Sequence, residues 1–97
     1  MRSLTESDLY EKQSAEIGAA ENIDKALIVV TWAISKNPLA FDEIPNTNGL
    51  RMAKTTAYTD GNSEVPALRL AFRVQDEEQI ILEAIGVIPE GFDDEGF

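Results

Sequence analysis

The chain of 97 residues contains neither cysteine nor histidine. Without cysteine it has no disulfide, no thiolate metal ligand and no cysteine nucleophile. Without histidine it lacks the commonest general base and the commonest metal ligand, so Ser-His-Asp and Cys-His mechanisms are excluded within this chain. Any chemistry must use carboxylates, Lys, Arg, Tyr or backbone groups, and we expect neither a cofactor nor a metal ion.

Long apolar runs are also missing. No stretch approaches the roughly 20 apolar residues that a helix needs to span a bilayer. Residues 1–6 contain no apolar core of a signal peptide. These patterns predict a cytoplasmic protein that makes no use of a membrane.

Basic residues are scarce, because 8 Lys and Arg face 18 Asp and Glu and give a formal net charge of −10. Taken alone, this balance disfavours nucleic acid as a partner, since phosphate binding needs clustered cations. The charge is uneven, however. Residues 1–49 carry a net charge of −4, residues 50–74 carry +2, and residues 75–97 carry −8. The middle segment is therefore the only locally basic part of the chain.

The composition is otherwise that of an ordinary globular protein, with 43% hydrophobic and 27% charged residues. The length is that of one domain. We expect a single domain over residues 1–89 and an acidic flexible tail over residues 90–97. An alternative is that this tail folds back over the basic segment as a pseudo-substrate, because its charge is complementary.

The first half of the chain predicts two helices. The first helix is expected over residues 7–20. Near its start, the spacing of Thr5 and Asp8 resembles a capping box. A second helix is expected from an N-cap at Asn22 to Lys36. Its apolar residues recur at helical spacing and also lie on other faces, which predicts burial on more than one side and places Trp32 in the core.

The second half predicts three strands, over residues 50–58, 68–74 and 79–87. Residues 68–74 alternate strictly between apolar and other side chains, and residues 79–87 are apolar almost throughout, which favours a central strand. Residues 1–6 show no convincing strand pattern. The resulting fold class is α+β, with two N-terminal helices packed on one face of a three- to four-stranded antiparallel sheet.

The cations of the basic segment lie on these strands. Arg69 and Arg73 are four residues apart, so they share a face at a separation of about 13 Å. Arg51 and Lys54 are an odd number apart, so an ideal strand places them on opposite faces. One interpretation is a cationic face that binds phosphates or carboxylates. The other is a solvated face whose arginines pair with local acids such as Glu83.

Two further groups of side chains have alternative interpretations. Tyr58, near a strand end, could act as a general acid or stacking group, or could simply pack at the rim of the core. Asp76, Glu77 and Glu78 could suggest a metal site. They are consecutive at a hairpin, so their side chains diverge, and we expect solvated charge there.

Three stretches together resemble the RelE/ParE superfamily of bacterial toxins from toxin–antitoxin pairs. The first stretch, Ile23 to Pro38, is similar to the end of the family's helical hairpin. The second, Leu50 to Thr55, is similar to the first strand of its meander. The third, Val65 to Leu82, is similar to a strand pair in which an LR and an FRV motif precede Asp76.

The resemblance implies a strand ahead of the helices and an antitoxin protein as partner, docked along the helices or the sheet. RelE-like members cut mRNA on the ribosome, and ParE-like members poison gyrase. In members that cut RNA, cations on the sheet stabilise the phosphate transition state. Lys54, Arg69 and Arg73 match those catalytic positions, with Arg51 and Tyr58 as candidates for binding the substrate.

Two hypotheses about function follow. The first is a toxin-family protein of a toxin–antitoxin pair. It is a ribosome-dependent mRNA ribonuclease or a catalytically degenerate form of one. The second is a non-enzymatic protein-interaction domain that keeps the fold as a binding scaffold. The net charge of −10 motivates the second, as does the acidic segment where RNA-cutting members carry a catalytic Tyr or His. The oligomeric state is left open.

Overall fold

The computed structural model describes residues 3–20 and 22–89, and the predicted acidic tail lies outside these residues. Helix α1 spans Asp8–Ala20, as predicted to within one residue. Its first turn is capped by Ser7, whose Oγ accepts a hydrogen bond from the Tyr10 N–H at 3.0 Å. The predicted capping box is therefore wrong, because Thr5 belongs to a strand and Ser7 supplies the acceptor.

Helix α2 spans Asp24–Lys36 and begins one residue later than an N-cap at Asn22 requires. The N-cap is Ile23, which makes no side-chain capping bond. Ile23 is instead 2% exposed and belongs to the core. Burial of Ile23, and not a polar cap, therefore fixes the start of this helix. The short 3₁₀ helix η1 (Pro38–Ala40) follows, where Pro38 ends the α-helical pattern.

Four strands form the main sheet in the order β1-β6-β5-β2, and a separate two-stranded hairpin joins β3 to β4. The strands are β1 (Ser3–Glu6), β2 (Leu50–Lys54), β3 (Tyr58–Asp60), β4 (Ser63–Val65), β5 (Leu68–Val74) and β6 (Gln79–Val87). Strands β5 and β6 have the predicted bounds, and β6 lies between β1 and β5 as a central strand.

Strand β1 adds a member to the sheet and corrects the expectation that the sheet is antiparallel throughout. Residues 1–6 show no convincing strand pattern, yet Ser3–Glu6 pairs with residues 79–82 and supplies the strand ahead of the helices that the resemblance implies. The pairing is parallel, so the sheet is mixed and not antiparallel throughout. Four residues of low apolar content carry little strand signal of their own. They become a strand because β6 offers an edge to pair with, which is tertiary context overriding local propensity.

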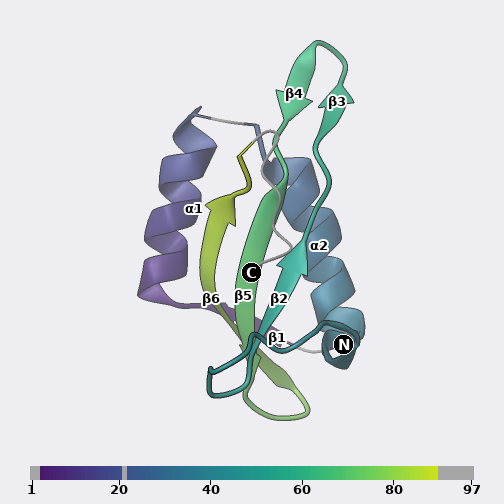
Figure 1. Cartoon of the computed structure of the whole chain (residues 1–97). Coiled ribbons are helices and arrows are strands. Elements are labelled where there is room, and N and C mark those ends of the chain that lie inside the picture. The colour runs from purple at the N-terminus through teal and green to yellow at the C-terminus, as the bar shows by residue number, and fades with distance from the viewer. Residues whose placement is uncertain (1–2, 21, 90–97) are drawn as a thin grey trace.

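The expected strand over residues 50–58 is interrupted at residues 55–57. At the interruption the Leu68 N–H donates to Thr55 Oγ1 at 2.8 Å, while the Thr55 N–H donates to the Leu68 carbonyl at 2.8 Å. Thr55 thus closes the main sheet at this end. The chain continues as the β3–β4 hairpin, which projects beyond the sheet in Figure 1.

One hydrophobic core lies between the helices and one face of the sheet. Alternate residues of β5 are buried, and Ile85 and Leu82, the register partners of Leu70 and Phe72 on β6, are buried with them. Residues of both helices join this cluster. The buried apolar residues are Tyr10, Ile23, Ala26, Val30, Ile34, Ala53, Val65, Leu68, Leu70, Phe72, Ile80, Leu82 and Ile85. The opposite face of the sheet, called here the open face, carries the remaining residues of each strand.

Candidate functional site

The open face of the sheet brings together three of the predicted catalytic cations. Lys54 on β2 is the register partner of Arg69 on β5, and Arg73 lies four residues further along β5, opposite Leu50. Lys54 is exposed, and the two arginines are half-buried. Lys54 and Arg69 are therefore two cations that lie opposite each other on adjacent strands of the open face.

Arg69 lies across the neighbouring strand. Its register partner on β6 is Gly86. The Arg69 Nε is 3.5 Å from the position that a Cβ would take at Gly86. This distance is an ordinary van der Waals contact, so the Arg69 side chain lies directly over Gly86 of β6.

Arg73 makes contacts with residues on both sides of β5. Its Nε lies 3.2 Å from Glu83 Oε2, in an ion pair whose side chains are 36% and 31% exposed. Its other donor reaches the Asn48 carbonyl in the loop before β2. The predicted pairing with Glu83 is confirmed for Arg73. This arginine links β6 to the start of β2, so phosphate binding would compete with contacts that hold the sheet together.

Glu83 reaches Arg73 because β6 carries a bulge. Ala71 pairs with Ala84 whereas Phe72 pairs with Leu82, so Glu83 is the additional residue between them. A bulge re-aims the side chain of the extra residue and increases the local twist. The bulge therefore turns a carboxylate toward the arginine on the open face, and sequence patterns alone do not reveal its position.

Arg51 does not join the three cations of the open face. Its register partner is the buried Phe72, so it lies on the helix-covered side of the sheet, opposite in direction to Lys54. It donates to the Phe41 carbonyl at 2.7 Å and contacts Glu43 Oε1 at 3.3 Å. Its side chain is only 19% exposed. These contacts connect the loop after η1 to β2, so Arg51 has a structural role.

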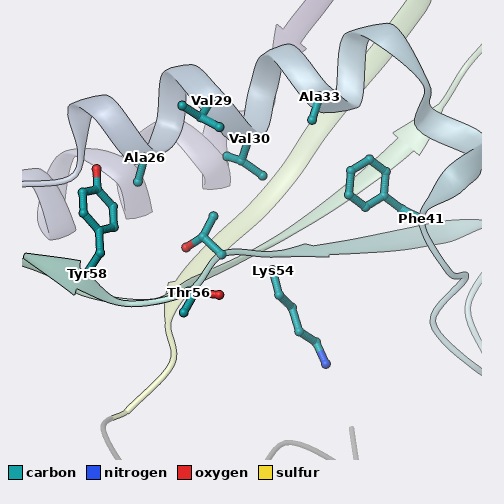
Figure 2. Close-up of a pocket in the computed structure, with 9 residues that line it drawn as sticks. Ala26, Val29, Val30, Ala33, Phe41, Lys54, Thr56 and Tyr58 are labelled. Carbon is teal, nitrogen blue, oxygen red and sulfur yellow. The ribbon is translucent and has the colours of Figure 1, made fainter.

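Tyr58 also lies apart from the open face. It stands on β3, is 41% exposed, and lines a groove between α2 and the strands β2 and β3. Figure 2 shows Tyr58 next to Ala26 of α2, while the Lys54 side chain extends away from that helix. The two candidates therefore present their functional groups on different sides of the molecule.

The groove itself is the second candidate site, with a volume of about 350 Å³. Its lining is mostly apolar, with threonine hydroxyls and one lysine at its strand side. The residues that line it are Ala26, Val29, Val30, Ala33, Phe41, Lys54, Thr55, Thr56 and Tyr58. A mostly apolar hollow with a few polar groups is the usual form of a binding site for another molecule.

Exposed apolar side chains continue from this groove over α2. Ile28 is 68% exposed, Val29 is 67% exposed and Trp32 is 54% exposed. We call these three residues the apolar α2 surface. The prediction that Trp32 lies in the core is wrong, because α2 is buried only along the side that carries Ala26 and Val30. The prediction relied on the apolar residues that occur on several faces of this helix. In the structure these residues form exposed contact area and are not buried on several sides.

Tyr10 of α1 belongs to the core and to neither candidate site. Tyr10 is 2% exposed, and burial, with a smaller effect of the nearby Glu6 charge, raises the pKa of its phenol to about 12. Tyr10 therefore stays neutral at physiological pH and serves as a core residue.

Within residues 3–20 and 22–89, no group of three or more Asp or Glu is placed to hold a metal ion. None of the helices in that part of the chain is long and apolar enough to cross a membrane.

No model of a protein family matches the chain, and a search of curated proteins finds no similar sequence. The functional interpretation therefore depends on the geometry of the two candidate sites described above.

Proposed function

We propose that this chain is a protein-binding domain that uses a RelE/ParE-like frame as a scaffold, with no ribonuclease activity of its own. The partner that the resemblance implies is an antitoxin protein. The binding surface is the apolar α2 surface together with the groove beside it.

The exposure of Ile28, Val29 and Trp32 is the observation that carries this proposal. Large apolar side chains gathered on one exposed helix face indicate an interaction site, since each loses contact with water only when a partner covers it. Tryptophan is also among the residues most enriched where binding energy is concentrated. The cations offer less, because Arg73 and Arg51 make the structural contacts described above.

A second candidate function is the ribosome-dependent ribonuclease, and the facing pair Lys54 and Arg69 favours it. In this alternative the two cations stabilise the scissile phosphate. Expression of the chain then arrests growth and depletes mRNA, and Arg69→Ala relieves both effects. Arg69→Ala is a sharper test than Arg73→Ala, because loss of Arg73 also removes the contacts to Glu83 and Asn48.

The test of the protein-binding function uses the tagged full chain purified from the organism that encodes it. We expect one protein to copurify in stoichiometric amount, and the purified pair to re-form a complex. Val29→Asn should weaken that complex by about tenfold, since it removes apolar contact worth roughly 1.5 kcal/mol. Leu9→Asn is the matched control, because Leu9 is 52% exposed on α1, away from the apolar α2 surface.

Equal binding by wild type and Val29→Asn would contradict the proposal. Intact mRNA in cells that express the wild type would exclude the ribonuclease alternative. Cleavage of mRNA by the pure chain with ribosomes, abolished by Arg69→Ala, would instead establish that alternative.

A further inference from the structure

The loop before β2 contains the only asparagine–glycine pair of the chain, Asn48-Gly49. An asparagine side chain reacts with its own backbone when the nitrogen of the next residue attacks the amide carbon. This reaction needs an accessible amide, an N–H that makes no hydrogen bond and a following residue whose backbone turns freely. Glycine meets the last condition best, because it has no Cβ to restrict its backbone or to shield its nitrogen.

Both reacting groups are accessible in the fold. Asn48 is exposed. Within residues 3–20 and 22–89, neither the Asn48 side-chain amide nor the Gly49 N–H makes a hydrogen bond. Gly49 has a φ of +83°, and no described atom outside residues 48–50 lies within 4 Å of the position that a Cβ would take there. The nitrogen can therefore approach the amide carbon without breaking a hydrogen bond, and the short reach within one residue pair favours the attack.

The other asparagines lack this combination, because a residue with a side chain or a proline follows each of them. A Cβ shields the adjacent nitrogen, and proline has no N–H to lose. The asparagines Asn22, Asn37, Asn46 and Asn62 precede Ile23, Pro38, Thr47 and Ser63, respectively. They therefore serve as internal controls for Asn48 in the same molecule.

The fold places a cation against the main-chain carbonyl of Asn48. The Arg73 guanidinium on β5 donates to this carbonyl, and the same side chain pairs with Glu83. The Ile44 N–H donates to the Leu50 carbonyl at 2.7 Å, which closes the loop against the start of β2. The main-chain carbonyl of Asn48 thus lies beside a positive charge, while its side chain is exposed.

We propose that Asn48 is a site of spontaneous deamidation in the folded protein, and that Arg73 directs the reaction toward isoaspartate. This inference is independent of the proposed protein-binding function, because it concerns the loop before β2 and not the apolar α2 surface.

The reaction has two steps. In the first, the Gly49 nitrogen gives up its proton to solvent and forms a bond to Asn48 Cγ. The bond from Cγ to the side-chain nitrogen breaks, and that nitrogen takes a proton from solvent and leaves as ammonia. In the second step, water adds to either carbonyl carbon of the resulting cyclic imide, and the bond from that carbon to the Gly49 nitrogen breaks. The sum consumes one water and releases one ammonia.

The carbonyl that water attacks decides the product. Opening at Cγ gives aspartate, whereas opening at the main-chain carbonyl carbon gives isoaspartate. Attack places negative charge on the carbonyl oxygen, and the Arg73 guanidinium beside the main-chain oxygen stabilises that charge. In isoaspartate the former main-chain carbonyl is a free carboxylate next to Arg73. The backbone is also one carbon longer just before β2 begins at Leu50.

The first test measures the rate. The purified full chain is incubated at neutral pH, and peptide mapping by mass spectrometry follows the loss of the amide at each asparagine. We expect Asn48 to react at least about tenfold faster than any other asparagine. Asn48→Gln is the matched control, because it keeps an amide and the main-chain carbonyl but must close a larger ring. The amide at position 48 should persist in this variant.

The second test measures the ratio of isoaspartate to aspartate, which chromatography of the position-48 peptide against synthetic standards resolves. We expect the ratio in the folded wild type to exceed that of the chain unfolded in urea by at least about threefold. Arg73→Ala should return the ratio to the unfolded value. Glu83→Gln removes the other partner of Arg73 and keeps the contact with Asn48, so its ratio should stay high.

The inference is overturned if Asn48 in the folded chain reacts no faster than the other asparagines. It is also overturned if the folded and unfolded wild type give the same isomer ratio, or if the ratio in folded Arg73→Ala equals that of the folded wild type. Circular dichroism verifies that each variant is folded, and the comparison of folded with unfolded wild type needs no variant.

Discussion

At the scale of single residues, Arg73 illustrates how a cation on a sheet can serve the fold. It lies on the open face with Lys54 and Arg69, where the RelE/ParE resemblance expects catalysis. Its guanidinium nevertheless bridges Glu83 and the Asn48 carbonyl, which belong to different neighbours of β5. The half-exposed ion pair contributes modestly, and the hydrogen bond to a backbone carbonyl adds to it.

We predict that Arg73→Ala lowers the free energy of unfolding by about 1–2 kcal/mol, because it removes the ion pair and the backbone hydrogen bond together. Urea unfolding of Arg73→Ala, Glu83→Gln and the double variant measures the coupling between the two side chains. Unchanged stability in Arg73→Ala would argue that these contacts contribute nothing and would return Arg73 to the catalytic candidates.

Tyr10 allows a second prediction at this scale, based on its raised pKa of about 12. The part of the tyrosinate absorbance that Tyr10→Phe removes should appear only near pH 12 in the folded chain. The unfolded chain loses the Tyr10 proton near pH 10 and the folded chain near pH 12. Stability from this group is therefore fully present below pH 10 and falls as pH rises toward 12. Tyr10→Phe should lack this part of the decline, and ionisation of the Tyr10 phenol near pH 10 in the folded chain would refute the assignment.

At the scale of elements, side chains at the start of α1 and within it bind backbone groups of β6 that no strand pairs with. Strand β1 covers β6 only as far as Leu82. Beyond that residue, Ser7 Oγ donates to the Glu83 carbonyl at 2.8 Å, and Gln13 Oε1 accepts from the Ile85 N–H at 2.9 Å. Two side chains of the helical segment thus satisfy backbone groups that an adjacent strand would otherwise bind.

We predict that Gln13→Ala destabilises the fold by about 1–2 kcal/mol, because it leaves the part-buried Ile85 N–H without its acceptor. Hydrogen exchange of the Ile85 amide should accelerate more than that of Leu82, which is the last residue of β6 that pairs with β1. Gln13→Glu keeps an acceptor oxygen and is the matched control. Equal exchange in wild type and Gln13→Ala would show that α1 does not protect this edge.

The elements that sequence patterns predicted best are those whose signal is internal to the element. Strands β5 and β6 show alternation and a continuous apolar run, and both have the predicted bounds. Strand β1 lacks such a pattern and depends on pairing with β6. The break after Lys54 was missed because Thr55 and Thr56 favour β-structure, while the hydrogen bonds between Thr55 and Leu68 end the sheet there.

The candidate sites were predicted less completely than the fold. Even spacing correctly placed Arg69 and Arg73 on one face, and odd spacing correctly separated Arg51 from Lys54. The groove depends on how α2 sits against β2 and β3, which no local pattern encodes. Trp32 was misplaced because an apolar residue on a helix has the same sequence signal whether the core or a partner covers it.

At the scale of the whole molecule, two surfaces compete for a functional interpretation. The open face carries the cations of the resemblance, but it belongs to a chain with net charge −10, which repels RNA at long range. The apolar α2 surface and its groove differ from the open face, because they would bind a partner by burying apolar area. Binding of a protein is the function that both the global charge and this surface allow.

The most direct measurement of this central claim is acrylamide quenching of Trp32 fluorescence in the free chain and in the complex with its copurified partner. Trp32 is 54% exposed in the free chain, so it should be quenched readily there. We predict that binding protects it by at least about fivefold, as expected for a residue at the centre of an interface. Equal quenching in the free and bound states would show that the partner leaves α2 uncovered, and would contradict the account.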